Sequence, residues 1–446
     1  MEFVIKISQF LLSLSLLIVL HELGHFIPAK WFKTRVEKFY LFFDIKYSLF
    51  KKKIGETVYG IGWLPLGGYV KIAGMVDESM DKEQMAGPPQ PWEFRSKPTW
   101  QRLIIMLGGV TVNFILAYVI YVFASWAYGD IDIKADSIKD GYYVGNPILT
   151  DLGIKTGDRV VAINDEKIIN YSDIRKKLIE AETITIANDE GSKTVTLPHD
   201  YLGKLSTSND RTFFEIRFPF VVGAVSDSSA NKSVDLKAKD IIAKINGEPL
   251  KYFDQVSDRL KPLSGQTVDV EIIREGEKLQ RQLKVDSNGK FGILPAGSLS
   301  DIERVGYYEI VQKEYSFVES LGVGLTKFTG QISSYGAQLK KIFTPSTGAY
   351  KGVGGFKAIY DIFPNTWSWE FFWQITAFLS IMLGVLNLLP IPALDGGHVM
   401  FLLYEMVSGR KPSEKFLERA QMVGFFILIA LVLFANGNDI FKAVFK

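Results

Sequence analysis

Four apolar runs, each long enough to cross a bilayer, constrain this 446-residue chain more than any other feature of its sequence. They cover residues 4–27, 103–128, 371–394 and 422–442. A helix of about 20 apolar residues spans the hydrocarbon core of a membrane. Because lipid offers no partner to a backbone polar group, such runs must form helices. The sequence therefore predicts an α-helical membrane protein with four spans and both termini on one side.

A cleavable signal peptide is the alternative interpretation of the first run. This run lacks the usual basic stretch before it and an A-x-A cleavage site after it, and a signal peptide should not carry the pair His21-Glu22. We therefore expect the first run to remain as a membrane helix that Pro28 ends.

Basic residues in the short loops predict the orientation of the spans, because such residues stay on the cytoplasmic side. They cluster after the first run and between the third and fourth runs: Lys30, Lys33, Arg35, Lys38, Lys51, Lys52, Lys53, Arg410, Lys411, Lys415 and Arg419. Both loops should be cytoplasmic, and residues 129–369 should lie outside the cytoplasm. The net charge of only +2 argues against a nucleic-acid partner.

The region outside the cytoplasm contains a repeated pattern. The stretch Gly157–Asp165, which reads GDRVVAIND, matches Lys239–Gly247, which reads KDIIAKING. Each copy predicts a β-branched strand, a tight Asn-Asp or Asn-Gly turn, a second short strand and a helix. A hairpin across Glu275-Gly276, with strands 268–274 and 279–285, follows the second copy. The pattern predicts a duplicated small domain.

The phrase GDRVVAINDEKI followed by a helix resembles PDZ domains of the bacterial envelope-protease type, here at 131–218 and 219–298. The resemblance implies a peptide ligand along a sheet edge. Structural spacers or filters without a ligand are the alternative. Residues 299–369 are interrupted by polar groups, so we expect an amphipathic helix on the outer membrane surface, with a packed linker as the alternative.

The first apolar run carries the strongest chemical signal in the chain. His21-Glu22-Leu23-Gly24-His25 matches H-E-x-x-H, and residues four apart share one face of a helix. Two imidazoles on one face can bind one Zn²⁺, with the glutamate placed to activate water. Ionisable groups inside a membrane helix are costly and usually functional. We therefore expect a zinc site near the cytoplasmic side of the bilayer.

Asp395 is the best candidate for a third ligand. The chain has no cysteine, so any metal site must use His, Asp and Glu. Asp395 lies at the end of the third run, at the same membrane depth as the histidine pair, and Pro390 and Pro392 before it predict a break in the helix at this depth. The alternative is a turn aspartate before Gly-Gly. We expect His398 to support the site rather than to bind the metal.

HELGH in the first run, together with Asn387-Leu388-Leu389-Pro390-Ile391-Pro392-Ala393-Leu394-Asp395-Gly396-Gly397, resembles the site-2 protease family of intramembrane zinc metalloproteases. The PDZ pair between the second and third spans narrows the resemblance to its bacterial RseP branch, which regulates sigma-E-type stress signalling. The resemblance extends over essentially the whole chain. It implies two membrane halves, 1–130 and 370–446, around the inserted domains.

The resemblance also implies roles for individual residues. His21, His25 and Asp395 would bind one Zn²⁺, Glu22 would be the catalytic base, and Asn387 would hold the substrate backbone. Residues 55–75 resemble the membrane-reentrant β-hairpin of the family, which implies that Gly67, Gly68 and Tyr69 bind substrate as an added strand. A plain cytoplasmic hairpin is the alternative there. Asn113 stands in a stretch similar to a Gly-Pro-x-x-Asn element, with Val110 in place of proline, which implies that Asn113 lies near the site and supports it. A buried asparagine that bonds a neighbouring helix is the alternative.

The function implied is an intramembrane endopeptidase in the bacterial inner membrane, with its PDZ domains on the periplasmic side. Its substrates would be transmembrane segments of anti-sigma-factor-like proteins already cut by a site-1 protease, and leftover signal peptides. The PDZ pair would pass only substrates with small outer parts. The rival hypotheses are a non-catalytic PDZ adaptor and a zinc transporter. An adaptor need not keep all four candidate site residues, which are His21, Glu22, His25 and Asp395. A transporter needs polar groups along a path through the membrane, whereas these residues lie at one depth.

Overall fold

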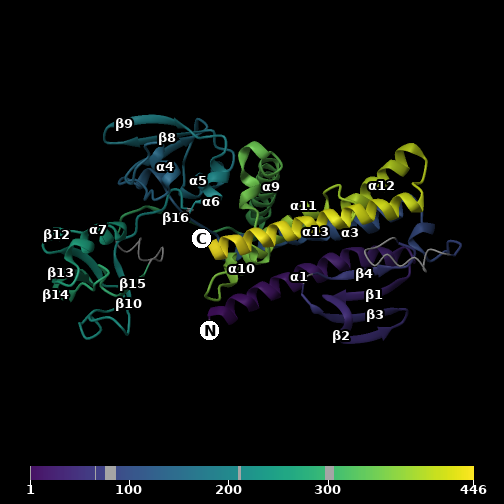
Figure 1. Cartoon of the computed structure of the whole chain (residues 1–446), viewed down its shortest axis with the longest axis horizontal. Helices are drawn as coiled ribbons and strands as arrows, with labels where there is room; N and C mark the ends of the chain where they lie inside the picture. Colours follow the sequence, from purple (N-terminus) through teal and green to yellow (C-terminus); the bar gives the residue numbers. More distant parts are fainter. Residues whose placement is uncertain (1, 66, 76–86, 209–211, 297–305, 446) are drawn as a thin grey trace. The chain divides into compact units, whose positions relative to one another are not determined.

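The computed structural model describes residues 2–65, 67–75, 87–208, 212–296 and 306–445 (Figure 1). The chain divides into two compact units, which are described separately here. The membrane unit comprises Met1–Gly129, Glu314–Lys340 and Val353–Lys446. The insert unit comprises Asp130–Lys313 and Lys341–Gly352.

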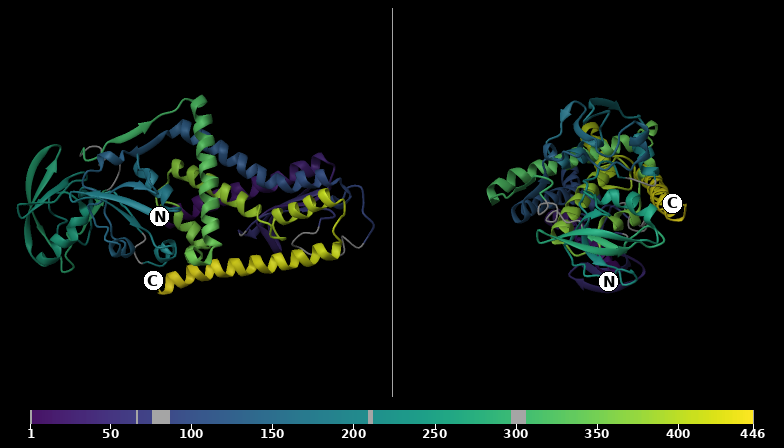
Figure 2. Two further views of the ribbon diagram at one scale, coloured as in Figure 1. Left: turned by 90° about the horizontal axis from the view of Figure 1, so that it is seen from above. Right: turned by 90° about the vertical axis from the view of Figure 1, so that its left-hand side faces the viewer.

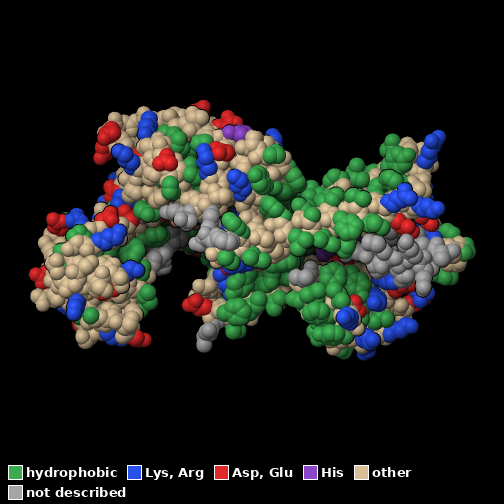
Figure 3. Space-filling model, viewed as in Figure 1, with side chains coloured by type: hydrophobic (Ala, Val, Ile, Leu, Met, Phe, Trp, Pro, Cys, Tyr) green, Lys and Arg blue, Asp and Glu red, His purple; other side chains and the backbone are tan. Residues whose placement is uncertain are grey.

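Within the described residues, four helices of the membrane unit are long and apolar enough to cross a bilayer. They are α1 (Glu2–Trp31), α3 (Thr99–Tyr128), α11 (Trp369–Asn387) and α13 (Glu414–Phe445). Each overlaps one of the four expected spans, but α1 continues past Pro28, the expected end, to Trp31. Hydrophobic side chains cover the visible face of α13, whereas Lys and Arg side chains gather near α12 (Figure 3). α12 (Asp395–Ser408) is the helix that follows α11.

Helices α1, α3 and α11 form the centre of the membrane unit. Buried side chains of α1 and α11, including Leu17, Phe372 and Leu379, pack in one apolar cluster. Buried hydroxyl groups also link the helices: Ser13 of α1 lies 2.9 Å from Thr376 of α11. Hydrogen bonds between membrane helices compensate for the polar groups that lipid cannot satisfy. These contacts fix α1, which carries the H-E-x-x-H sequence.

The expected third span, 371–394, is wrong at its end. α11 stops at Asn387, a non-helical turn follows, and Asp395 is the first residue of α12. Pro390 and Pro392 cannot donate backbone hydrogen bonds and clash with a continuing helix, which explains the break. Non-helical backbone is tolerated at such depth only where protein or a cavity surrounds it. The break places Asp395 at a helix N-terminus that faces α1.

α13 is a long helix that returns along the membrane unit to α10 (Phe356–Ile362) (Figure 2). Asp439 of α13 accepts hydrogen bonds from the backbone N–H groups of Gly355 and Ala358, at 2.9 and 3.1 Å. Asn436 accepts one from Phe356 at 3.3 Å. The last polar residues of α13 therefore cap the N-terminus of α10 and satisfy its unpaired backbone donors.

A four-stranded sheet follows α1. Its strands are β1 (Val36–Leu41), β2 (Phe43–Ile54), β3 (Thr57–Leu64) and β4 (Tyr69–Ile72), in the order β2-β3-β1-β4. The expected hairpin over 55–75 is wrong, because β3 and β4 do not pair. β1 lies between them, parallel to β3 and antiparallel to β4. The turn with Pro65, Gly67 and Gly68 instead carries the chain across β1, and β4 becomes an end strand.

α9 (Phe317–Ile342) is the amphipathic helix expected between the insert and the third span. Gly324 lies directly against the backbone of Val122 in α3, and Lys327 donates a hydrogen bond of 2.8 Å to Ser125. Exposed apolar side chains such as Val318 and Leu325 lie on its other face. α9 thus packs on a membrane helix along one side.

The first part of the insert unit is built around a four-stranded sheet of order β7-β6-β8-β9. Its elements are β5 (Asp130–Ile133), α4 (Pro147–Asp151), β6 (Arg159–Ile163), β7 (Glu166–Lys167), α5 (Tyr171–Leu178), β8 (Thr183–Asn188), β9 (Gly191–Thr196) and α6 (Tyr201–Thr207). Nineteen buried residues form its core cluster, which includes Ile163, Ile174, Ile184 and Tyr201. We refer to this part as insert domain 1.

Insert domain 2 repeats the plan. Its elements are β10 (Val221–Val225), β11 (Ile241–Ile245), β12 (Glu248–Pro249), α7 (Val256–Leu260), β13 (Thr267–Arg274), β14 (Glu277–Lys284) and β15 (Ile293–Ala296). The main sheet has the order β14-β13-β11-β10-β15. The expected hairpin across Glu275-Gly276 is confirmed, with β13 and β14 paired over their whole length. Residues 297–305, and with them the expected boundary at 298–299, lie outside the described residues.

The matched residues of the sequence repeat do the same structural work in both domains. Asp158 and Asp240 are buried, and each accepts a 2.8 Å hydrogen bond from the backbone N–H three residues before it. Asn164 and Asn246 both adopt a φ of 50° at a tight turn. Asparagine tolerates this left-handed conformation better than most residues. The repeated residues therefore have structural roles in both domains and do not indicate a catalytic site.

The expectation of one surface segment over 299–369 is wrong in two places. β16 (Ile310–Lys313) pairs antiparallel with β5 of insert domain 1. Residues 341–352 also pack on this domain, where Gly348 meets the backbone of Gly203 and Ser346 lies 3.0 Å from His199. The sequences of these stretches look like a linker, because their packing on insert domain 1 depends on tertiary contacts.

Arg217 joins the two insert domains. Its guanidinium group forms two hydrogen bonds with Asp254, at 3.2 and 2.8 Å, and stacks 4.2 Å from the ring of Tyr252. Tyr308 donates a 2.7 Å bond to the Arg217 carbonyl. Asp140 of domain 1 accepts hydrogen bonds from Lys251 and Tyr252 of domain 2. Paired, stacked arginine contacts of this kind have a defined geometry and hold surfaces in register.

We predict that Arg217→Ala loosens the two insert domains. The chain has no native cysteine, so spin labels can be placed at Glu190→Cys and Asn288→Cys, both in exposed turns. Pulsed electron resonance should give a narrow distance distribution in the parent and a broad one in Arg217→Ala. The exposed Arg175→Ala is the charge-matched control and should stay narrow. An equally narrow Arg217→Ala distribution would contradict the account.

Acid should loosen the same contact. Hydrogen bonds from Lys251 and Tyr252 lower the pKa of Asp140 below its ordinary value of 3.8. A lowered pKa in the folded state means that the contact is complete above that value and is lost as pH falls through the folded pKa. The label distance should therefore broaden below about pH 4 while circular dichroism stays native. A distribution that is broad already at pH 6 would contradict this prediction.

Candidate metal centre

His21, His25 and Asp395 converge within the membrane unit. The Nε2 atoms of His21 and His25 lie 3.4 and 3.3 Å from Asp395 Oδ2, and 3.3 Å from each other. The histidines come from one face of α1, and the carboxylate comes from the first residue of α12. Three ligand atoms that face one point, within 4.8 Å of one another, form a group that could hold a metal ion.

The environment of these atoms fits zinc. Among the described residues, Asp395 Oδ2 is buried without a hydrogen-bond partner. His25 Nδ1 lies 2.8 Å from the carbonyl oxygen of Ile105, so it carries the hydrogen and leaves Nε2 free to bind. A buried carboxylate oxygen without a donor is costly unless a cation neutralises it. Two imidazole nitrogens and one carboxylate oxygen are a ligand set that hydrolytic zinc sites use.

Glycines let α3 approach the histidines closely, a feature that the sequence analysis missed. A Cβ on Gly24 would lie 2.4 Å from the carbonyl oxygen of Gly108, and one on Gly108 would lie 1.9 Å from that of Gly24. A Cβ on Gly109 would lie 2.4 Å from His25 Nε2. Small residues at a helix crossing allow backbone contact in membranes. Gly24 inside the H-E-x-x-H sequence, opposite a Gly-Gly pair, was the available signal.

Glu22 lines a cavity of about 760 Å³ that also contains His21, His25 and Asp395. The Glu22 side chain lies against the turn before β4, 3.5 Å from the position of a Cβ on Gly68, and Val70 of β4 lines the same cavity. Glu22 therefore stands between the three candidate ligands and the end strand of the sheet. This is a suitable place for a group that takes a proton from a nucleophile within hydrogen-bonding reach.

The turn before β4 forms one wall of this cavity. A Cβ on Gly68 would lie 2.7 Å from the carbonyl oxygen of Tyr40 and 2.4 Å from Ile18, so only glycine fits between β1 and α1. Gly67 lies against the ring of Phe43. The Tyr69 hydroxyl donates a 2.8 Å hydrogen bond to Asp44. Gly67, Gly68 and Tyr69 thus all line the cavity that contains the candidate ligands.

Two asparagines contact His21. Asn387, the last residue of α11, has its amide nitrogen 3.4 Å from His21 Nε2. Asn113 of α3 is buried, and its amide nitrogen lies 3.0 Å from His21 Nδ1. α3 continues as a helix through Val110, so the absent proline leaves no break there. His398 lines the same cavity, one helical turn beyond Asp395.

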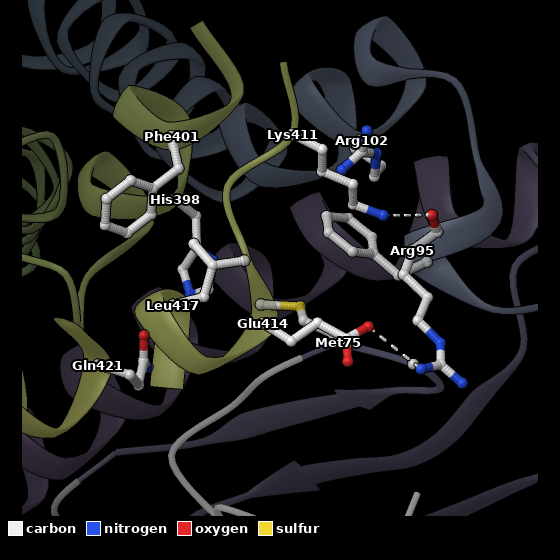
Figure 4. Close-up of a pocket in the computed structure, with 11 residues that line it drawn as sticks. Met75, Arg95, Arg102, His398, Phe401, Lys411, Glu414, Leu417 and Gln421 are labelled. Carbon is white, nitrogen blue, oxygen red and sulfur yellow. Dashed lines mark hydrogen bonds and ion pairs between the residues drawn. The ribbon is translucent and has the colours of Figure 1, made fainter. Parts of the chain in front are cut away.

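A smaller cavity of about 60 Å³ lies next to the first and shares Met75, His398 and Gln421 with it (Figure 4). Arg95, Arg102, Lys411 and Glu414 also line it. Lys411 donates a 3.1 Å hydrogen bond to the carbonyl of Arg95, and Glu414 lies 3.4 Å from the guanidinium group of Arg95. Gln421 could not be predicted to lie here, because a single glutamine in an apolar helix belongs to no motif.

Arg102 and Glu405 form a second contact that the sequence analysis missed. This ion pair, with Arg102 buried and Glu405 half-buried, joins α3 to α12, the helix that begins with Asp395. Burial would raise the pKa of the Glu405 carboxyl, but hydrogen bonds from Arg102 and Thr99 bring it below its ordinary value. Removing one partner of a buried pair leaves an uncompensated charge. The pair therefore fixes the helix that presents Asp395.

The comparison with known proteins identifies the class. The model of peptidase family M50 matches residues 9–431, and the chain belongs to this family. It is therefore a metalloendopeptidase, a hydrolase of peptide bonds.

The chain is similar over nearly its full length to curated bacterial proteins. It is 27% identical to the regulator of sigma-E protease RseP of Salmonella typhimurium, over 97% of this chain and 98% of the relative. It is also 27% identical to Escherichia coli RseP, over 98% and 99%. A Vibrio cholerae protein provisionally named a zinc metalloprotease is 26% identical, over 96% and 97%.

One similar solved structure is the PDZ domain of the SdrC-like protein from Listeria innocua. It covers 18% of this chain and 97% of that domain, at 22% identity and a TM-score of 0.17.

We predict that Gly109→Ala abolishes metal binding. The added methyl group would overlap both imidazoles, at 2.4 Å from His25 Nε2 and 2.6 Å from His21 Cε1. Zinc per chain, measured by mass spectrometry of purified protein, should fall close to zero. Gly330→Ala in α9 is the matched control, since nothing lies within 4 Å of its added Cβ. Full zinc occupancy in Gly109→Ala would contradict the packing described here.

Proposed function

We propose that the chain is an intramembrane zinc endopeptidase that uses His21, His25 and Asp395 as ligands and Glu22 as the catalytic base. The observation that carries the proposal is the convergence of all four groups on one cavity in the membrane unit. Family membership supports the class of reaction. The membrane-length helices around the site support a substrate that is itself a membrane segment.

Zinc held by these three residues would supply a Lewis acid that activates water and polarises the scissile carbonyl. Glu22 would take a proton from the attacking water and later give it to the leaving amine. The contact of Glu22 with the turn before β4 supports this role, because it places the side chain between the ligands and β4. The cavity supplies the room that water and a peptide both need.

The end strand β4 is the proposed docking edge for the substrate. Among the described strands of this sheet, only β1 pairs with β4, which makes β4 an end strand beside the cavity. A helical peptide bond is inaccessible to a nucleophile, whereas strand addition holds a peptide extended. Gly67, Gly68 and Tyr69 would align it, and Asn387, close to His21, would hold its backbone.

The proposed substrates are transmembrane segments of single-pass proteins whose outer domains a site-1 protease has already removed. The similarity to proteins named regulators of sigma E protease supports anti-sigma-factor-like substrates, with leftover signal peptides as a second group. The basic residues of the short loops support placing the site near the cytoplasmic face of a bacterial inner membrane, with the insert outside.

We propose that the insert domains are PDZ domains that screen substrates by the size of their outer part. The Arg217 contacts support a fixed pair rather than two free modules. In domain 2, β15 of the same chain already pairs with β10. A peptide that adds to β10 would therefore have to displace it, which favours a filter over peptide capture at that edge.

The filter can be tested with the loosened pair. Arg217→Ala should speed cleavage of substrate that still carries its outer domain and leave cleavage of the trimmed substrate unchanged. Both rates can be followed by immunoblot in membranes, with Arg175→Ala as control. Equal rates of Arg217→Ala and parent on untrimmed substrate would argue against a filter that depends on the fixed pair.

The catalytic assignment is tested by Glu22→Gln. Loss of a general base typically slows a reaction by about 10²- to 10⁴-fold. The variant should keep its zinc, because the three ligands remain, and lose cleavage of a model transmembrane substrate. Glu2→Gln, in the exposed first turn of the same helix, is the matched control and should cleave normally. Unchanged cleavage by Glu22→Gln would remove Glu22 from the mechanism.

A further inference from the structure

Asn113 has a fully buried amide side chain that contacts a candidate ligand and has no role in the proposed chemistry. It lies on α3 with its amide nitrogen 3.0 Å from His21 Nδ1, the ring nitrogen that faces away from Asp395. Its amide oxygen is buried and, among the described residues, has no hydrogen-bond partner. Nothing in the described part of the chain therefore holds this amide in one of its two orientations.

The neighbouring histidine shows what a ligand of this site requires. A neutral imidazole carries one hydrogen, on Nδ1 or on Nε2. His25 Nδ1 lies 2.8 Å from the Ile105 carbonyl oxygen, which can only accept, so the hydrogen is on Nδ1. The lone pair of His25 Nε2 therefore points at Asp395 Oδ2, 3.3 Å away. An acceptor behind the ring fixes both the tautomer and the orientation.

His21 meets the same requirement only with an acceptor at its Nδ1. Its Nε2 lies 3.4 Å from Asp395 Oδ2, so as a metal ligand it must carry its hydrogen on Nδ1. The amide nitrogen of Asn113 bears only hydrogens and cannot accept. The two ends of an amide have almost the same shape, and their assignment follows from the hydrogen-bond network. Turning the amide places its oxygen at the 3.0 Å position.

We propose that Asn113 is a positioning residue for the metal centre: its side-chain oxygen accepts the Nδ1 hydrogen of His21 and holds Nε2 toward Asp395. α3 thus supplies both supporting acceptors, the Ile105 carbonyl for His25 and the Asn113 amide for His21. The inference rests on the proposed function, because it assigns the tautomer from metal binding.

Helix packing is the competing explanation for a buried asparagine in a membrane helix. Ser380 of α11 donates a 2.8 Å hydrogen bond to the backbone carbonyl of Asn113. This packing contact does not involve the Asn113 side chain and survives its replacement. Ser380→Ala is therefore a matched control, since it removes a buried polar contact at the same helix pair without touching His21.

The experiment measures zinc affinity of the full chain in detergent by competition with a chromogenic chelator, together with thermal unfolding of the zinc-free protein. Removing a hydrogen-bond partner of a metal-binding histidine typically costs about 10- to 100-fold in metal affinity. Asn113→Leu should weaken zinc binding by this factor. Asn113→Asp keeps the acceptor and should bind zinc nearly as tightly as the parent, and Ser380→Ala should do so as well. Cobalt spectra of Asn113→Asp and the parent should agree, which reports ligand geometry independently of the leucine variant.

Parental zinc affinity in Asn113→Leu, or an Asn113→Asp chain as weak as Asn113→Leu, would overturn the inference. A leucine variant that only unfolds at lower temperature, with unchanged zinc affinity, would assign Asn113 to helix packing. These outcomes are separate from failure of the proposed function. If the parent itself bound no zinc, the proposed function and the inference would both fall.

Discussion

The backbone contact between α1 and α3 at Gly24 and Gly108 determines how closely α3 supports the two histidines of the candidate metal centre. It brings α3 so close to α1 that Gly109 touches both imidazoles and the Ile105 carbonyl reaches His25. No side chain larger than hydrogen fits at this crossing. The membrane adds no hydrophobic force between helices, so such close packing is what holds them together.

The chemistry of the site depends on charged groups, above all the Asp395 carboxylate, that are unfavourable in a membrane without partners. A carboxylate in a low-dielectric region is unfavourable unless a cation or donors balance it. Asp395 meets its two histidine partners because the helix break after Asn387 turns the chain toward α1. The Arg102–Glu405 pair then fixes α12 from its other end. The broken helix and the Arg102–Glu405 pair together place the Asp395 carboxylate at membrane depth.

The sequence predicted the parts of this arrangement that have short-range signatures. The spacing of His21 and His25 follows from helical geometry, and two prolines announced the break before Asp395. The duplicated insert was recognisable because Asp158 and Asp240 cap equivalent turns. The features that the sequence did not predict depend on packing between residues far apart in the chain. β1 lies between β3 and β4, and residues 341–352 pack on insert domain 1; no local pattern encodes either arrangement. The role of the Ile105 carbonyl could not be predicted either, since every residue has a backbone carbonyl and no residue type marks this one.

The central claim is that His21, His25 and Asp395 bind one zinc ion. X-ray absorption at the zinc edge of the purified full-length protein tests this claim most directly. The account predicts one zinc per chain, two imidazole ligands with zinc–nitrogen distances of about 2.0–2.1 Å, and oxygen for the remaining ligands. A chain that holds no zinc after reconstitution, or a spectrum with fewer than two imidazole ligands, would contradict it.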